Sequence, residues 1–379
     1  MVKIITPGHN PITDSLIMWG IVYLTEDCKG RVEGKGGRYE IFIEGECDLE
    51  KNFRKRFENK IIENPSKKKG RFDLSEEERV RNDIDPDMRT GVAESIFYVL
   101  NEIDKGVRFE DIFTFDHFEK FQEGRFGRGK ILKTLYIPLS GVYGKYQLME
   151  FKAKDKPYRA CYFCISLAYL GFATSASIVR IGKTERLYSI IGFEGEVDLD
   201  GLRTLLNPIW FIASQDLLSR AYRSKKKTPA LSPFAISLIY TTRMEPAARR
   251  VIGKASWYMG MIGYETGGLK RITKFDIVEL TSISNFVEDV IKIYPYLPEL
   301  IENLLDSIAI ENDSDVAINI LSEIAFNRRL ELIYSFLRNL KVLLKRLEGD
   351  QRQARARQLR NRISRNITSK LGEALIFTL

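Results

Sequence analysis

Histidine and cysteine are scarce in this sequence. Its 379 residues include two histidines, His9 and His117, and four cysteines. Two histidines leave little material for a Ser-His-Asp triad or a histidine-rich metal site. Four cysteines are too few for the disulfide framework of a small secreted scaffold at this length. No set of residues forms a convincing catalytic constellation, so we expect a protein that is not an enzyme and that uses no metal or cofactor.

Long hydrophobic runs are also missing. The longest apolar stretches, residues 15–24 and 165–172, are too short to cross a bilayer. Residues 1–7 lack the apolar core and the small-residue cleavage site of a signal peptide. We therefore expect a cytoplasmic protein with no membrane partner.

The residues that are present indicate a globular protein with a large core. Hydrophobic residues make up 44% of the chain and aromatic residues 11%, which excludes a disordered chain. The length favours two or three domains. We predict an α+β fold, with a mixed α/β body over residues 1–283 and a helical bundle over residues 284–379. The abundance of Lys, Arg, Glu and Ile, with little Gln, favours a thermophilic source.

Several local patterns predict particular elements. Asn10 before Pro11 predicts the start of a helix over residues 12–24, with Asn10 as its N-cap. Residues 161–171 predict a buried helix that ends at Gly171, followed by strands over residues 178–181 and 187–193. Residues 34–38, with glycines at positions 34, 36 and 37, predict a turn into a strand over residues 39–43. A charged amphipathic pattern predicts a helix over residues 48–62, and an aromatic-rich amphipathic pattern predicts a helix over residues 109–121.

The net charge of +8 is concentrated at one end of the chain. Residues 338–370 hold eleven Lys or Arg and two acids, whereas residues 1–337 balance to zero. A neutral body with a strongly basic end points to contact with a polyanion or an acidic partner. Nucleic-acid phosphate is the leading candidate, an acidic protein is second, and solvation alone remains an alternative.

Candidate nucleic-acid-binding residues come from basic turns and from the basic C-terminal segment, which we predict as one long final helix with an apolar stripe. They are Asn10; Lys67, Lys68, Lys69 and Arg71; Arg125, Arg128 and Lys130; Arg223, Lys225, Lys226 and Lys227; and Arg352, Arg355, Arg357 and Arg360.

Residues 124–130 satisfy the phosphate-loop pattern G-x-x-x-x-G-K. Ile131 follows, so the hydroxyl that would hold magnesium is missing. A helical pattern precedes the segment and a strand-like pattern follows it, whereas a nucleotide-binding loop needs the opposite order. We reject nucleotide hydrolysis here, although a flexible Gly/Arg loop could still follow a nucleic-acid backbone.

Two further patterns raise the question of metal binding. Asp83, Asp85, Asp87 and Glu94 fit the spacing of a calcium loop, but Met88 stands where that loop needs glycine. An acidic helix start before residues 90–100 is the simpler interpretation. A metal-dependent nuclease that uses these carboxylates remains the alternative function.

Cys161 and Cys164 could form half of a zinc site or a redox pair. The sequence offers no second C-x-x-C pair and no histidine close by. We therefore favour two buried thiols on one helix face. His117, within the aromatic-rich segment 109–121, is interpreted as a packed or half-exposed side chain.

Two motifs together resemble a known family. One is Gly8-His9-Asn10-Pro11-Ile12-Thr13-Asp14 before an apolar helix; the other is Cys161-x-x-Cys164-x-x-Leu167-Ala168-x-Leu170-Gly171 before strands. They are similar to the large subunit of archaeal CRISPR interference complexes of type I-A (Cascade).

The resemblance implies a non-catalytic subunit of a complex that contains crRNA. Such a subunit binds double-stranded DNA near the PAM and recruits a separate helicase-nuclease. Base pairing supplies sequence specificity in RNA-guided recognition, while protein contacts anchor the duplex. A scaffold that docks an acidic protein is a further alternative.

Overall fold

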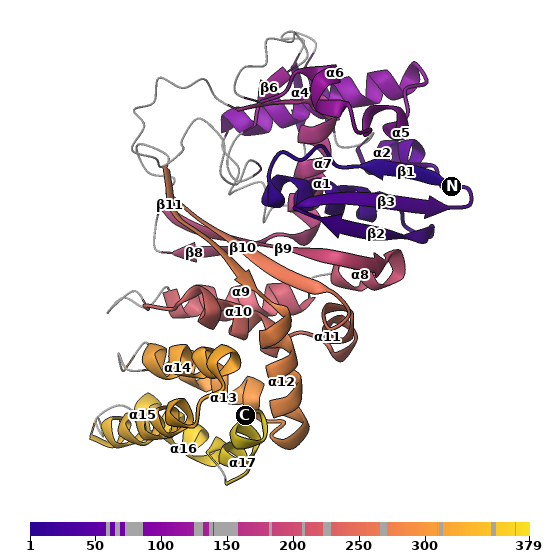
Figure 1. Cartoon of the computed structure of the whole chain (residues 1–379). Helices are drawn as coiled ribbons and strands as arrows, with labels where there is room; N and C mark the ends of the chain where they lie inside the picture. The colour runs from indigo at the N-terminus through magenta and orange to yellow at the C-terminus, as the bar shows by residue number, and fades with distance from the viewer. Residues whose placement is uncertain are drawn as a thin grey trace. The chain divides into compact units, whose positions relative to one another are not determined.

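The structure is a computed structural model (Figure 1). It describes the chain except residues 58–60, 65–68, 73–85, 125–131, 136–138, 140–157, 182–183, 207–208, 223–228, 266–270, 309, 311–313, 350–353 and 368. Strands and helices are both abundant, which confirms the predicted α+β class. Among the described helices, none has the length and apolar character needed to span a membrane.

The chain forms two compact units. The first comprises Met1–Ala176, Ile190–Asn207 and Gly268–Phe275, and the second comprises Ser177–Ser189, Pro208–Gly267 and Asp276–Leu379. Residue 284, where the sequence analysis places a domain boundary, lies inside the second unit, and that boundary stays a prediction.

An antiparallel sheet organises the first unit. Its strand order is β1 (Val2–Ile5), β3 (Arg38–Glu44), β2 (Lys29–Lys35) and β9 (Glu185–Asp198). Lys35 pairs with Arg38 across a two-residue turn whose glycines, Gly36 and Gly37, both have positive φ. This is the backbone that a tight hairpin turn requires, and it confirms the turn predicted at residues 34–38.

Two apolar helices form the core of this unit. Helix α1 (Pro11–Leu24) begins at Asn10, whose side chain accepts hydrogen bonds from the backbone N–H groups of Ile12 and Thr13, so the predicted N-cap is confirmed. Helix α7 (Tyr162–Ser175) packs along α1. The prediction that α7 ends at Gly171 is wrong, because Gly171 lies in the helix interior where the two backbones approach closely. A Cβ atom there would lie 1.8 Å from the carbonyl oxygen of Leu16.

Apart from the 19-residue helix α4, the other elements of the first unit are short. They are α2 (Leu49–Phe57), β4 (Ile61–Asn64), β5 (Lys69–Phe72), α4 (Pro86–Asp104), α5 (Phe109–Ile112), α6 (His117–Phe121), β6 (Leu132–Thr134), β7 (Arg159–Cys161) and α8 (Leu199–Leu206). The helix predicted over 48–62 is too long, because β4 begins at Ile61. The helix predicted over 109–121 is two short helices, α5 and α6.

A disulfide bond joins Cys28 to Cys47, and the two residues flank the β2–β3 hairpin. Cys161 and Cys164 are free thiols in the core.

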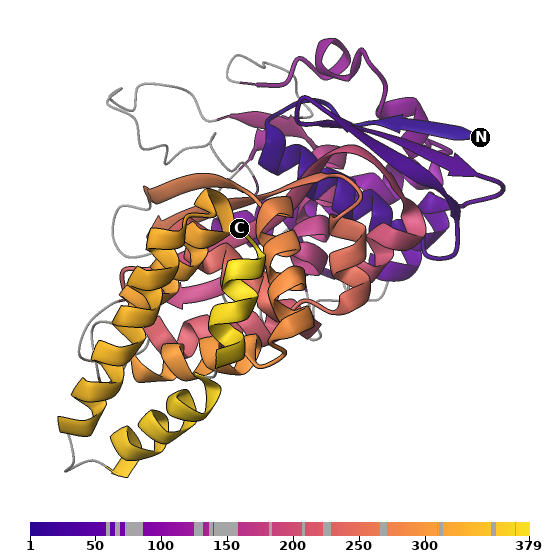
Figure 2. The same cartoon turned by 60° about the horizontal axis from the view of Figure 1, so that its bottom comes forward.

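The second unit contains β8 (Ser177–Ile181), β10 (Ser256–Glu265), residues 276–279 of β11 (Arg271–Glu279) and the described helices after residue 208. Strand β8 pairs with the first part of β9, and β10 neighbours β11. Its helices are α9 (Ile209–Tyr222), α10 (Pro233–Thr242), α11 (Pro246–Ile252), α12 (Thr281–Ile293), α13 (Leu297–Ser307), α14 (Ser314–Asn327), α15 (Leu330–Gly349), α16 (Ala354–Asn366) and α17 (Ser369–Phe377). The basic C-terminal segment is therefore three helices, α15 to α17, and the prediction of one long final helix is wrong (Figure 2).

Candidate nucleic-acid interface and a buried histidine–cysteine cluster

Helix α16 is held in the second unit by a narrow apolar stripe. Ala356, Leu359 and Ile363 are buried, with at most 4% of their surface exposed. Their spacing of three and four residues places them on one face, and the helix packs against α13 and α15. The predicted apolar stripe is thus confirmed at Leu359 and Ile363, and most of the other side chains of α16 are exposed.

The remaining surface of α16 is strongly cationic. The helix contains five arginines and no acidic residue. Arg355, Arg357, Arg362 and Arg365 are exposed, and Arg360 is half-buried, with Nη2 located 3.2 Å from Oε1 of Glu348. At 100° per residue the arginines lie on both flanks of the apolar stripe.

Two features make this much positive charge costly without an anion. Arg362 and Arg365 are three residues apart, so two like charges are neighbours on the helix surface. Arg355 also lies in the first turn, where the helix dipole disfavours a cation. A polyanion such as nucleic-acid phosphate would remove both penalties.

The other predicted nucleic-acid-binding residues are placed only in part. Asn10 caps α1, which gives it a structural role. Lys69 and Arg71 belong to strand β5, where they pair with Asn64 and Ile62, so the prediction of a loop there is wrong. The following predicted residues lie outside the described part of the chain: Lys67, Lys68, Arg125, Arg128, Lys130, Arg223, Lys225, Lys226, Lys227 and Arg352. Binding by all of these residues stays a prediction.

A second cluster lies in the core of the first unit. It comprises His117, Glu123, Cys161 and Cys164, whose potential ligand atoms all lie within 4.8 Å of one another. Within the described residues, no other set of three or more His, Cys, Asp or Glu side chains has this arrangement.

Three local features bring these side chains together. His117 begins α6, and Gln122 ends that helix in the left-handed conformation, so that Glu123 turns back toward the core. Cys161 ends β7 and is also the N-cap of α7, which places Cys164 in the first turn of α7. Gly124 forms a β-bridge with Arg159 and fixes the Glu123 segment beside the start of α7.

The distances within the cluster are short. His117 Nε2 lies 3.2 Å from Cys164 Sγ, 3.6 Å from Cys161 Sγ and 3.2 Å from Glu123 Oε1. Cys164 Sγ lies 3.9 Å from Glu123 Oε2. The side chains of His117 and Glu123 are 1% and 0% exposed, and both cysteines are fully buried.

Further contacts fix the orientation of these groups. His117 Nδ1 lies 2.8 Å from the carbonyl oxygen of Ile112, so that nitrogen carries the proton and donates it to the carbonyl. The backbone N–H of Cys161 donates to Glu123 Oε1 at 2.6 Å. His9 lies on the other side of Glu123, with Nε2 located 3.0 Å from Oε2, and its Nδ1 is 2.8 Å from the hydroxyl of Tyr158.

Burial and charge act in opposite directions on the titration of the cluster. Burial disfavours the charged form of His117, but hydrogen bonds with Cys161 and Glu123 outweigh it and raise the pKa of His117 to about 10. Burial likewise opposes ionisation of Glu123, yet the two histidines lower the pKa of its carboxyl well below the usual range. Burial and the neighbouring Cys161 raise the pKa of the Cys164 thiol. The metal-free cluster therefore contains a buried imidazolium–carboxylate pair.

Sequence reasoning missed this cluster because its members are far apart along the chain. His117 precedes Cys161 by 44 residues, and no spacing rule joins them. The interpretation of His117 as a packed side chain is confirmed, because its ring is buried and packs against Phe113 and Phe121. Its two ring nitrogens contact polar groups.

The calcium-loop-like and phosphate-loop-like motifs of the sequence do not form binding sites within the described part of the chain. Asp87 lies in α4, Glu94 forms an ion pair with Lys133 at 2.9 Å, and Asp83 and Asp85 lie outside the described part. The phosphate-loop-like segment has α6 before it and β6 after it, which is the inverted order expected from the sequence.

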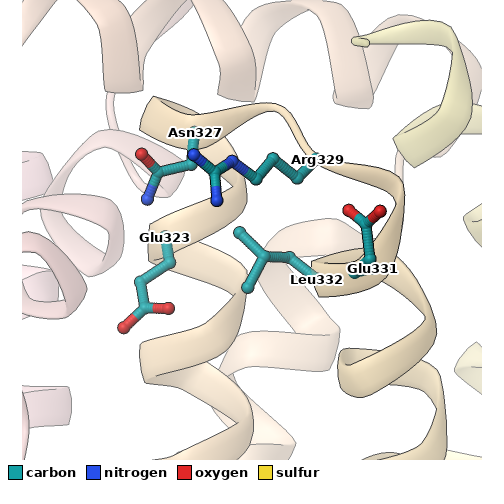
Figure 3. Close-up of a pocket in the computed structure, with 5 residues that line it drawn as sticks. All are labelled: Glu323, Asn327, Arg329, Glu331 and Leu332. Atoms are coloured by element: carbon teal, nitrogen blue, oxygen red, sulfur yellow. The ribbon is translucent and has the colours of Figure 1, made fainter.

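A surface pocket of about 610 Å³ lies at the turn between α14 and α15. Figure 3 shows its lining: Glu323, Asn327, Arg329, Glu331 and Leu332. The two carboxylates, one amide, one guanidinium and one apolar side chain form no recognisable ligand-binding pattern, so this pocket suggests no function.

Comparison with known proteins places the chain among CRISPR-associated proteins. The family described as "CRISPR-associated protein (Cas_Csa4)" matches residues 2–362. A "CRISPR system associated protein Cas8" from Thermoproteus tenax is 30% identical over 204 residues, which is 48% of this chain and 53% of the relative. The match thus spans about half the length of that relative.

Proposed function

Because this chain belongs to the CRISPR-associated Cas_Csa4 family, we propose that it is a non-catalytic large subunit of a crRNA-guided DNA-interference complex. It binds double-stranded target DNA near the PAM, and it recruits a separate helicase-nuclease that cuts the DNA. Base pairing with the crRNA supplies the sequence specificity, and this chain supplies contacts to the duplex.

The arginine surface of α16 is the observation that supports this proposal most directly. Four exposed arginines on one acid-free helix match the requirement for binding a phosphate backbone. Guanidinium groups are suited to this task because they bind phosphate oxygens in a bidentate geometry.

The salt dependence of DNA binding tests the proposal. We expect replacement of Arg355, Arg357, Arg362 and Arg365 with Gln to weaken binding of double-stranded DNA, and the loss to be largest at low salt. Each phosphate contact contributes about 0.9 to the slope of log K against log salt, so the slope should become shallower by about three to four. Fluorescence anisotropy over a range of ionic strengths measures this.

A matched control removes four exposed cations elsewhere. Lys29, Lys51, Arg250 and Lys254 are exposed and lie outside α16. Their replacement with Gln changes the net charge equally, yet should leave the slope nearly unchanged. An equal reduction of the slope in both variants would show that general charge, and not the α16 surface, is responsible.

The alternative of an acidic protein partner is distinguished by pull-down from a cell extract. If α16 binds nucleic acid, nuclease treatment releases the proteins that co-purify through this helix. If these proteins remain bound after digestion, and the four-arginine variant loses them, α16 is a protein-docking surface and the DNA-binding role of this helix is wrong.

A further inference from the structure

We propose that His117, Glu123, Cys161 and Cys164 form a structural zinc site in the first unit. The site has four protein ligands, all buried, and so leaves no open position for substrate or water. The inference rests on the geometry of these side chains and is independent of the function proposed for α16.

The contacts of His117 Nε2 are close to the ligand separations of a tetrahedral zinc centre. Zinc binds sulfur at about 2.3 Å and histidine nitrogen at about 2.0–2.1 Å, so tetrahedral ligands lie roughly 3.3–3.8 Å apart. His117 Nε2 lies 3.2 Å and 3.6 Å from the two sulfurs, and 3.2 Å from Glu123 Oε1. All four ligand atoms lie within 4.8 Å of one another, so the widest pair would have to close by up to about 1 Å to bind the ion.

The groups around the ligands are also those that a zinc site requires. His117 donates its Nδ1 proton to the carbonyl of Ile112, which leaves Nε2 facing the two sulfurs as the ligand atom. The backbone N–H of Cys164 points at Cys161 Sγ, at 3.4 Å. A thiolate accepts such a bond better than a thiol, and the N-terminus of α7 stabilises negative charge at both cysteines.

The donor set favours zinc over the other common ions. Two thiolates and an imidazole are soft or borderline ligands, which calcium and magnesium do not select. A four-coordinate site of two sulfurs, one nitrogen and one carboxylate oxygen suits Zn²⁺, whose d¹⁰ shell imposes no other geometry.

A redox role for the two cysteines is less compatible with the structure. Thiol–disulfide exchange requires that a partner thiol reach one of the sulfurs, and both sulfurs are fully buried. His117 and Glu123 would in addition serve no purpose for a simple disulfide. A metal ion accounts for all four side chains at once.

The ion would add a link between two segments that already meet at the Gly124–Arg159 β-bridge. His117 and Glu123 lie in a stretch of short helices, whereas Cys161 and Cys164 begin the core helix α7. Binding free energy at such a site contributes to folding free energy. The zinc would thus anchor the α6 segment to the α1–α7 core.

The test uses the full chain, purified in buffer without added metal. We expect elemental analysis to find one zinc per chain, and release of that zinc when the thiols are modified with a mercurial reagent. Replacement by Co²⁺ should give the intense absorption bands of tetrahedral cobalt with thiolate ligands. These measurements on the unaltered chain stand even if a variant fails to fold.

Variants identify the ligands. C161S and C164S should each lower the amount of bound zinc to well below one per chain. Each should also weaken the thiolate-to-cobalt absorption band, because one of the two thiolate ligands is lost. The double variant C28S/C47S, which removes the other two cysteines, should keep one zinc. E123Q should retain both thiolate ligands but bind Co²⁺ at least tenfold more weakly, since loss of one ligand weakens the site.

Three results would overturn the proposal. The first is a folded chain without zinc that shows no thiolate–cobalt spectrum on addition of Co²⁺. The second is a Cys161–Cys164 disulfide in the purified protein, found by mass spectrometry of peptides under non-reducing conditions. The third is zinc that is lost equally from C28S/C47S and from C164S, which would indicate adventitious binding.

Discussion

At the scale of single residues, glycines decide how closely the core helices pack. Gly20 of α1 and Gly171 of α7 face each other's backbones, and a Cβ at either position would lie about 2 Å from a carbonyl oxygen of the other helix. Backbone atoms cannot move aside as a flexible side chain can. The sequence analysis interpreted Gly171 as a helix stop because glycine commonly ends helices, but here its lack of a side chain is needed for packing.

We expect Gly171→Ala to lower the free energy of unfolding by roughly 1–3 kcal/mol, because the helices must separate to accept the methyl group. Gly91→Ala is the matched control, since Gly91 also lies in a helix but has open space around it. That change should raise the stability by roughly 0.5–1 kcal/mol through helix propensity. Urea denaturation followed by circular dichroism measures both, and equal effects would contradict the close approach.

At the scale of elements, the two strands of the β2–β3 hairpin are joined at both ends. Its tight glycine turn joins the strands at one end, and the Cys28–Cys47 disulfide joins the flanking segments at the other. A covalent bond across this hairpin restricts the unfolded chain far more than the folded one. Composition gave no reason to pair these two cysteines, because only the register of the strands places them together.

Reduction of this disulfide should lower the free energy of unfolding by about 3 kcal/mol, the value for a loop of about 20 residues. Thermal unfolding of the C28S/C47S variant against the unaltered oxidised chain measures this loss. Under strong reducing conditions the two proteins should unfold at similar temperatures. If the reduced and oxidised forms of the unaltered chain unfold alike, the bond does not contribute to stability.

The helix α16 shows how an element can be recognised before its surroundings are known. Its apolar residues at spacings of three and four, and its five arginines, are visible in the sequence. The sequence does not reveal that this helix packs against α13 and α15. The sequence also gave no clear end between α15 and α16, because apolar periodicity continues through residues 340–375.

At the scale of the whole molecule, charge is segregated along the chain and not spread over it. The excess of positive charge lies in residues 338–370, and residues 1–337 balance to zero. Such a distribution suits a subunit that binds nucleic acid with one part and other proteins with the rest. This separation of a basic region from a neutral region agrees with the proposed role in a complex in which another chain cuts the DNA.

We therefore expect the purified full chain to leave double-stranded DNA intact when incubated with Mg²⁺ or Mn²⁺. Two-metal cleavage requires carboxylates that converge on one cavity, and Glu94 is instead paired with Lys133. Gel electrophoresis of labelled DNA measures this. Cleavage that disappears in a D83N/D85N/D87N variant would establish the nuclease alternative and contradict the proposed role.

The sequence by itself determined the properties that depend on neighbours along the chain. The N-cap at Asn10, the hairpin turn at Gly36 and Gly37, and the apolar helices follow from local backbone preferences and periodicity. The charge segregation follows from composition alone, and the family resemblance rested on two short motifs. Each of these is encoded within about fifteen residues or by simple counting.

Only the tertiary structure decided which distant residues meet. His117 and Glu123 reach the Cys161–Cys164 pair because a left-handed residue ends α6 and a β-bridge fixes the next segment. Gly171 serves packing and not termination because α1 lies against it. These outcomes depend on contacts between residues about 40 to 150 positions apart, which local propensity does not encode. The physical reason is that burial brings such residues together only when the whole core assembles.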